Sequence, residues 1–138
     1  MNKILLFACL ACLCSVGFLL LYYLGHDVYS GNWIDYKPSQ QCAGKNITTM
    51  NYTIPVGVSM RPTIWNGNKV YYTAYDPQVI IVEGDVLRVN YGGDAIIHRV
   101  VGVYPEYFFL KGDNAVERDP VAYRYSSIVA VICAVSYN

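Results

Sequence analysis

The sequence predicts a mainly β protein, a single compact domain tethered by one N-terminal transmembrane helix. Two observations lead to this prediction. Residues 4–24 form an uninterrupted apolar run, whereas after residue 51 short runs rich in Val, Ile and Tyr alternate with Gly, Asn, Asp and Pro. The length of 138 residues is enough for one domain and too short for two.

The apolar run comes first along the chain. Residues 4–24 contain no charge and no proline, and their number is close to the roughly 20 residues that cross a bilayer as a helix. The alternative is a cleaved secretory signal, whose apolar part is usually about 7–15 residues long and ends at a small-residue cleavage site. Tyr22, Tyr23 and Leu24 offer no such site. We therefore assign residues 1–25 as a transmembrane anchor in contact with the lipid bilayer.

The flanks of the anchor predict its orientation. Lys3 and the terminal amine precede it, and the positive-inside tendency then leaves the N-terminus in the cytoplasm. The expected location is the membrane, with a single pass and the domain on the extracytoplasmic or lumenal side. Ten basic and ten acidic residues give no net charge, which argues against a nucleic-acid partner.

Residues 26–50 are polar and have no sustained periodicity, which is typical of a stalk or a loosely packed cover. The compact domain is expected at residues 51–138. Its strands are predicted from five runs with strand length and strand composition, at 69–75, 85–91, 95–104, 107–112 and 127–137. After Leu24 the only helical signal is a turn that begins near Ser59.

Cysteine usage leaves one question open. Three of the five cysteines lie within the apolar run, where they pack as small apolar residues. Cys42 and Cys133 lie outside it, and the sequence does not decide whether they are free or joined by a disulfide. Asn46 and Asn51 each begin a glycosylation sequon, which has meaning only in a host with the modifying enzymes.

A hydrolase needs a nucleophile, a base and donors for an oxyanion, and few residues of this chain qualify. Of the two histidines, His26 lies at the end of the anchor, so His98 is the candidate base. Alternation along its strand sends His98 to the face opposite Ile97. An imidazole ordinarily titrates near pH ~6.5, which suits a base at neutral pH.

Ser59 is the candidate nucleophile. It follows Gly57 and precedes Pro62, two residues that restrict the chain to a kinked segment able to present a hydroxyl and a free backbone N–H. Asp113 and Asp119 are the candidate carboxylates that would hold the imidazole. Taken singly, each of these residues is equally typical of an ordinary turn or strand.

The order and spacing of the segments resemble the type I signal peptidase family from about Pro55 to Tyr123. Ser59-Met60-Arg61-Pro62 matches its SMxP box, and Gly84-Asp85-Val86 matches its GDxV box. His98-Arg99-Val100-Val101-Gly102 stands where the family has a basic residue before RV(V/I)G. Gly112-Asp113-Asn114, with Asp119 six residues beyond Asp113, matches the last box. His98 in place of the bacterial Lys makes the chain similar to the archaeal and endoplasmic-reticulum branch.

The resemblance implies a signal-peptidase-like β domain and a serine endopeptidase that needs no cofactor or metal. Ser59 would attack the scissile carbonyl after His98 takes its proton, Asp119 is the preferred residue to orient His98, and Asp113 is the second choice. Substrates would be signal peptides of exported preproteins, and accessory subunits are conceivable partners. Bacterial enzymes often carry a serine two residues before the nucleophile; Gly57 stands there, so the oxyanion hole would depend on backbone N–H groups, chiefly that of Ser59.

Two other functions are compatible with the sequence. One is an enzyme of the same fold that processes a narrow client. The other is a non-catalytic subunit or a membrane-tethered binding module, in which Ser59 and His98 would point away from one another.

Overall fold

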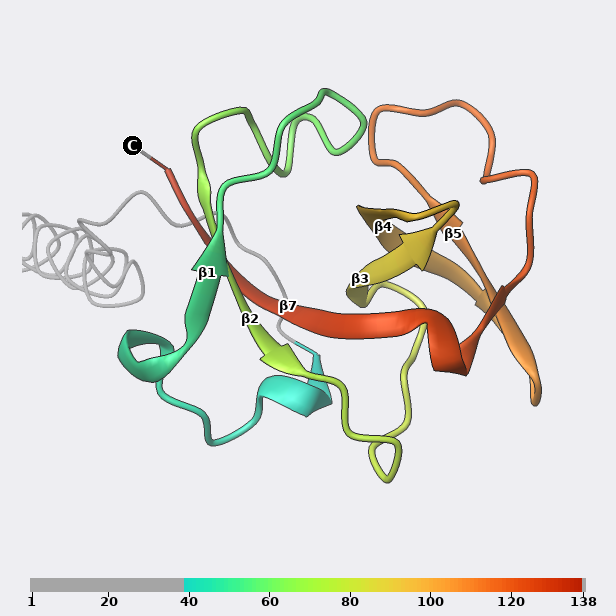
Figure 1. Ribbon diagram of the computed structural model, residues 1–138, viewed down its shortest axis with the longest axis horizontal. Coiled ribbons are helices and arrows are strands. Elements are labelled where there is room, and N and C mark those ends of the chain that lie inside the picture. The colour runs from blue at the N-terminus through green and yellow to red at the C-terminus, as the bar shows by residue number, and fades with distance from the viewer. Residues whose placement is uncertain (1–38, 138) are drawn as a thin grey trace, which may run out of the picture. The chain divides into compact units, whose positions relative to one another are not determined.

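The computed structural model of the chain describes residues 39–137, all of which belong to one compact unit. They form a seven-stranded antiparallel sheet in the order β1-β2-β7-β3-β4-β5-β6 (Figure 1). The strands are β1 (Asn51–Thr53), β2 (Lys69–Ala74), β3 (Val86–Tyr91), β4 (Asp94–Val103), β5 (Tyr107–Lys111), β6 (Tyr123–Arg124) and β7 (Ile128–Ser136). Three single-turn 3-10 helices complete the described chain: η1 (Gln40–Cys42), η2 (Ile47–Thr49) and η3 (Tyr125–Ser127).

The predicted mainly β class is confirmed, and the five predicted runs became β2, β3, β4, β5 and β7. The sequence did not predict β1 and β6. They have three and two residues, too few for an alternating pattern to be visible. Both are the outermost strands of the sheet, where a short strand leaves little unpaired backbone.

Strand β7 lies between β2 and β3, and its residues 130–135 are all buried. Its side chains contribute to two apolar clusters: Val131 and Cys133 belong to one, Ile132 and Val135 to the other. A strand buried on both faces appears in the sequence as a continuous apolar run, as residues 128–135 do. The second cluster includes Met60 and Ile64, so the segment that follows Ser59 is anchored in the core.

The described part of the predicted stalk or cover segment packs against the sheet. Cys42 forms a disulfide with Cys133 of β7, which answers the question that the sequence left open. The buried Gln41 side chain donates to the carbonyls of Asp76 and Val79, at 2.9 and 2.8 Å, and accepts from the Asp76 N–H. The loop between β2 and β3 is thereby fixed to η1.

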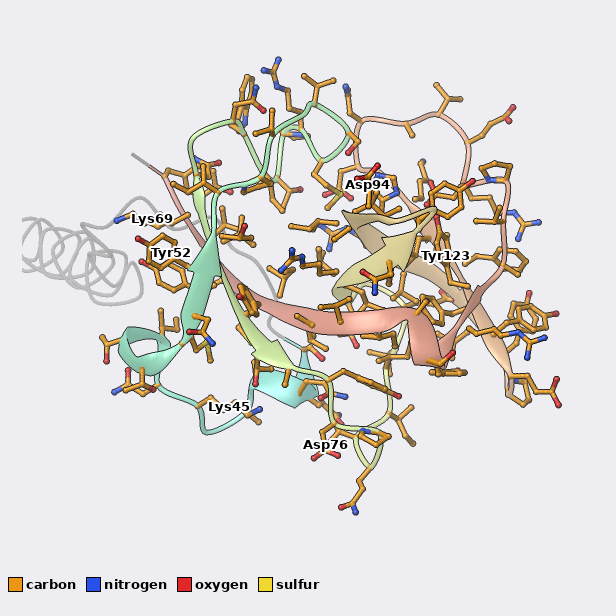
Figure 2. The ribbon with its side chains drawn as sticks, in the orientation of Figure 1. Lys45, Tyr52, Lys69, Asp76, Asp94 and Tyr123 are labelled. Atoms are coloured by element: carbon orange, nitrogen blue, oxygen red, sulfur yellow. A yellow bond between two sulfur atoms is a disulfide. The ribbon has the colours of Figure 1, made fainter. Side chains whose placement is uncertain are left out.

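At the other end of the same segment, Asn46 caps η2 by accepting from the Thr48 N–H, and Asn51 begins β1. Lys69 of β2 lies over the ring of Tyr52 in β1, with its ammonium 5.3 Å from the ring centroid (Figure 2). Within residues 39–137 we find no helix long and apolar enough to traverse a bilayer. The anchor predicted at residues 1–25 lies outside the described residues.

Candidate active site

The chain between β1 and β2 presents Ser59. Hydrogen-bonded turns follow it, with the Arg61 N–H donating to Val58 O at 3.2 Å and the Ile64 N–H to Met60 O at 2.8 Å. The predicted turn near Ser59 is therefore present. Burial of Met60 and Ile64 fixes these turns, while Ser59 itself is exposed. The result is a serine held on an ordered loop and open to solvent.

A second loop, from Gly112 to Asp119, lies beside the Ser59 loop (Figure 1). The Asn114 N–H donates to the Ser59 carbonyl at 2.8 Å, which fixes the direction of the peptide group after Ser59. Gly112 is buried at the contact. A Cβ atom at this position would lie 2.6 Å from Ser59 O, 3.1 Å from Ser59 Cβ and 3.2 Å from His98 Nε2. The absence of a side chain at Gly112 is what lets the nucleophile loop and the histidine approach each other.

His98 lies on β4, the strand next to β5, and its ring is largely buried. Its Nδ1 atom lies 2.8 Å from Asp119 Oδ2 and 3.1 Å from Oδ1. Because a carboxylate only accepts, Nδ1 carries a proton, and in the neutral ring Nε2 is then the atom with the free lone pair. Nε2 is the atom that faces Gly112 and Ser59. This is the tautomer that a general base requires.

Tyr123, at the start of β6, supports Asp119 from the other side. Its hydroxyl donates to Asp119 Oδ2 at 2.8 Å, and its ring is buried against Phe108. Burial, and then the hydrogen bond to the Asp119 carboxylate, raise the pKa of Tyr123. The phenol therefore stays a donor at neutral pH, and the order of contacts is Tyr123, Asp119, His98.

Ser59 and His98 are neighbours, but no hydrogen bond joins them in the described part of the chain. A Cβ atom added to Gly112 would lie 3.1 Å from Ser59 Cβ and 3.2 Å from His98 Nε2. The distance between Ser59 Cβ and His98 Nε2 therefore cannot exceed the sum of these two distances. Among the described residues, the Ser59 hydroxyl and the Ser59 N–H have no hydrogen-bond partner. Both groups are thus free to meet a substrate, and catalytic hydrogen bonds commonly tighten only when substrate binds.

The structure brings Asp119, and not Asp113, into contact with His98. Asp113 instead accepts two hydrogen bonds from Arg99, Nε to Oδ1 and Nη2 to Oδ2, both at 2.7 Å. Burial by itself would raise the pKa of the Asp113 carboxyl, but the hydrogen bonds from Arg99 and Thr63 outweigh it and hold the pKa below its usual range. Asp113 is therefore an ionised partner of Arg99.

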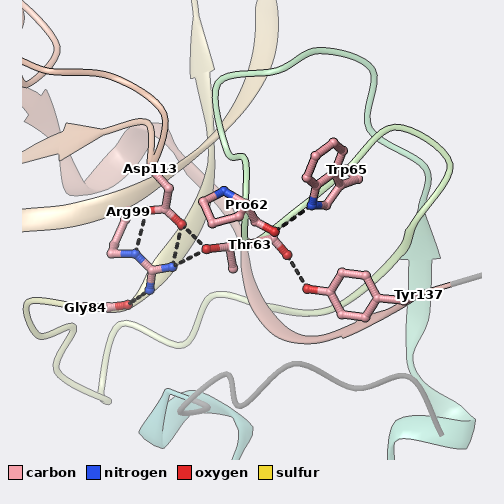
Figure 3. Close-up of polar contacts among 7 residues, drawn as sticks. All are labelled: Pro62, Thr63, Trp65, Gly84, Arg99, Asp113 and Tyr137. Atoms are coloured by element: carbon pink, nitrogen blue, oxygen red, sulfur yellow. Dashed lines mark hydrogen bonds and ion pairs between the residues drawn. The ribbon is translucent and has the colours of Figure 1, made fainter.

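This ion pair belongs to a network that fixes the chain just after Ser59 (Figure 3). Thr63 donates to Asp113 and, through its carbonyl, accepts from the Tyr137 hydroxyl. Burial raises the pKa of Tyr137 to about 12, so this hydroxyl is protonated. Arg99 also donates to the Gly84 carbonyl at 2.8 Å, which ties in the turn before β3. Three of the four sequence boxes thus meet in one network.

A cleft of about 200 Å³ opens beside Ser59 and His98. Its walls come from the chain after β1 and from β4, and they combine polar groups with apolar side chains, Val56, Met60, Ile96 and Ile97 among the latter. Arg88 of β3 also lines it. Such a cleft can hold a small number of apolar side chains next to the candidate nucleophile.

The sequence did not point to three residues with a clear place in this site. Tyr123 lies outside the matched boxes, four residues after Asp119. Arg99 was noted only as part of a box. Gly112 was interpreted as part of a turn, whereas its close approach to two other segments follows from the tertiary structure alone.

Within residues 39–137, no three His, Cys, Asp or Glu side chains gather as metal ligands would.

Compared with protein-family models, with curated proteins and with solved structures, the chain matches none of them. The family resemblance therefore depends on the residues of this sequence and on the geometry just described.

Proposed function

We propose that this chain is a membrane-bound serine endopeptidase that removes signal peptides from exported preproteins, a type I signal peptidase of the archaeal and endoplasmic-reticulum branch. The observation that carries the proposal is the order Asp119–His98–Ser59. The carboxylate holds Nδ1 at 2.8 Å, and Nε2 faces the loop of an exposed serine. The domain is then a signal-peptidase-like β domain.

The chemistry is acyl transfer. Nε2 of His98 takes the Ser59 proton as the serine oxygen attacks the scissile carbonyl, and the imidazolium is stabilised by Asp119. The free N–H of Ser59 donates to the developing oxyanion. The imidazolium gives its proton to the leaving amine, and water, activated by the same histidine, then hydrolyses the ester. No metal or cofactor takes part.

The supporting geometry belongs to this mechanism. The network of Asp113, Arg99 and Thr63 holds the chain after Ser59, so that the hydroxyl and the N–H of one residue are presented together. Preorganised donors of this kind cost no rearrangement during the reaction. We assign Asp113 a positioning role and Asp119 the contact with the base.

Two features support a domain on the extracytoplasmic side of a membrane. The apolar run at residues 4–24 would hold the enzyme in the same plane as a membrane-held signal peptide, which raises their effective concentration. The Cys42–Cys133 disulfide is of the kind that persists in oxidising compartments. Accessory subunits and the lipid bilayer are the partners that this location implies.

The test is cleavage of a model preprotein in detergent by the purified full-length protein. The wild type is expected to release the mature product, and Ser59→Ala and His98→Ala are expected to lose about 1,000-fold or more of kcat. Ser126→Ala, which removes an exposed serine of η3, is the matched control and keeps full activity.

Equal cleavage by the wild type and by Ser59→Ala would overturn the assignment. If the wild type binds the preprotein and never cleaves it, the protein is a membrane-tethered binding module. If it cleaves one exported protein and leaves others intact, it is a peptidase with a narrow client.

A further inference from the structure

Among the described residues that line the cleft beside Ser59, Arg88 is the one with a permanent charge. It lies on β3, directly opposite Ile97 in the β3–β4 pair, and Ile97 precedes the candidate base His98. Its side chain is half-buried, and its neighbours in the cleft include Met60, Ile64 and Ile97, all apolar. A cation in such surroundings needs a partner to offset the loss of water.

The structure offers Arg88 little compensation. Its guanidinium lies over the ring of Tyr72 at 6.0 Å from the centroid, the outer limit of a cation–π contact. Within residues 39–137 no carboxylate forms an ion pair with it. Arg99, one residue beyond His98 on β4, is in the opposite situation because Asp113 engages it with two hydrogen bonds.

We propose that Arg88 forms a carboxylate-binding subsite in the cleft, which selects substrates with an acidic side chain near the scissile bond. Guanidinium N–H donors form a planar fork that matches a carboxylate, and such charge-assisted pairs are strong in a partly buried site. The apolar side chains of Met60, Ile64 and Ile97 in the same cleft lower the local dielectric and strengthen the pair. The proposal rests on the proposed function for its substrate, and it narrows that substrate to a peptide with one carboxylate at a fixed position.

The position of the carboxylate follows from strand geometry. Opposite residues of an antiparallel pair lie about 5 Å apart and consecutive Cα atoms 3.8 Å apart, so the Arg88 Cα lies within about 9 Å of the His98 Cα. An extended peptide advances about 3.3 Å per residue. Because Ser59, Arg88 and His98 line one cleft, we place the selected residue within about three positions of the bond that Ser59 attacks.

The experiment scans a peptide substrate with the full-length enzyme. Asp and its neutral isostere Asn are placed in turn at each of three positions on either side of the cleavage site. At one position Asp is expected to raise kcat/KM about tenfold over Asn. Arg88→Met and Arg88→Gln lose this preference, and Arg88→Glu prefers Lys to Asp there. Arg124→Met, which removes an exposed arginine of β6, keeps the wild-type preference.

A binding measurement separates this subsite from the proposed catalysis. Ser59→Ala is titrated with fluorescent peptides, and the Asp peptide is expected to bind about tenfold more tightly than the Asn peptide only while Arg88 is present. This outcome supports the subsite even if no cleavage is ever seen. Equal binding of Asp and Asn peptides, or a preference that survives in Arg88→Met, would overturn it. A last comparison uses peptides whose C-terminus is the scanned residue, made either as the free acid or as the amide. If Arg88 favours only the free acid, it binds a terminal carboxylate, and the proposal of a side-chain carboxylate is overturned.

Discussion

At the scale of single residues, the absence of a side chain at Gly112 decides whether the site can form. An added methyl group would meet the Ser59 carbonyl at 2.6 Å, and a backbone atom cannot yield as a flexible side chain can. We expect Gly112→Ala to lower kcat/KM about 100-fold, because a displacement of about 1 Å at reacting groups has this effect. Gly102→Ala is the control, since its methyl would make only ordinary contacts, the nearest at 3.5 Å. Similar activity of both variants would contradict this account.

Tyr123 is a second residue whose function follows from one atom. Tyr123→Phe keeps the ring between its aromatic neighbours and removes the donor to Asp119. We expect kcat to fall about tenfold at unchanged KM, because Asp119 loses the hydrogen bond that fixes its position against His98, and a hydrogen bond to a charged group contributes about 1.5–3 kcal/mol. The less stabilised carboxylate holds the imidazolium more strongly, so the acidic limb of the pH–rate profile should move to higher pH.

The control for this variant is Tyr125→Phe, which removes a hydroxyl bonded to the Tyr104 carbonyl away from the site. A purely structural role for Tyr123 would lower the fraction of folded enzyme and leave the pH profile where it is. An unmoved profile would therefore limit Tyr123 to packing.

At the scale of elements, the loop from Gly112 to Asp119 and the chain after Ser59 are joined by the ion pair of Asp113 with Arg99. Because the folded pKa of Asp113 is depressed, its contribution to stability is fully present above the ordinary carboxyl pKa of about 3.9 and is lost as the pH falls through the folded value. We expect urea unfolding, followed by tryptophan fluorescence, to show the wild type more stable than Asp113→Asn at pH 7. This difference should shrink on acidification below about pH 4.

Asp94→Asn is the matched control, an exposed carboxylate at the β3–β4 turn (Figure 2). Its difference from the wild type should stay small at every pH. A gap between the wild type and Asp113→Asn that is constant from pH 7 to about pH 3 would mean that Asp113 does not act as an ionised partner.

At the scale of the whole molecule, features that depend on local sequence patterns could be predicted, whereas features that depend on tertiary contacts could not. The main strands were visible because apolar runs between turn residues are a local property, and β7 was recognisable from its unbroken run. Ser59, His98 and Asp119 were suggested by ordered motifs, and the fold brings these three segments to one place. The choice of Asp119 over Asp113 as the contact of His98, the donor Tyr123 and the packed η1 segment depend on contacts between residues far apart in sequence.

The Cys42–Cys133 disulfide joins the most distant positions of these contacts, with a sequence separation of 91. It joins the segment before the sheet to the inner strand β7, so it restricts the unfolded chain over most of the domain. In the loop-entropy view, a cross-link of this span stabilises by about 4–5 kcal/mol, and measured values for native disulfides are about 2–5 kcal/mol. We expect the Cys42→Ala/Cys133→Ala double variant of the full-length protein to lose stability in this range, measured by urea unfolding. Adding a reductant should have the same effect on the wild type and none on the double variant. Unchanged stability in both experiments would show that η1 is held by the Gln41 hydrogen bonds and apolar packing alone.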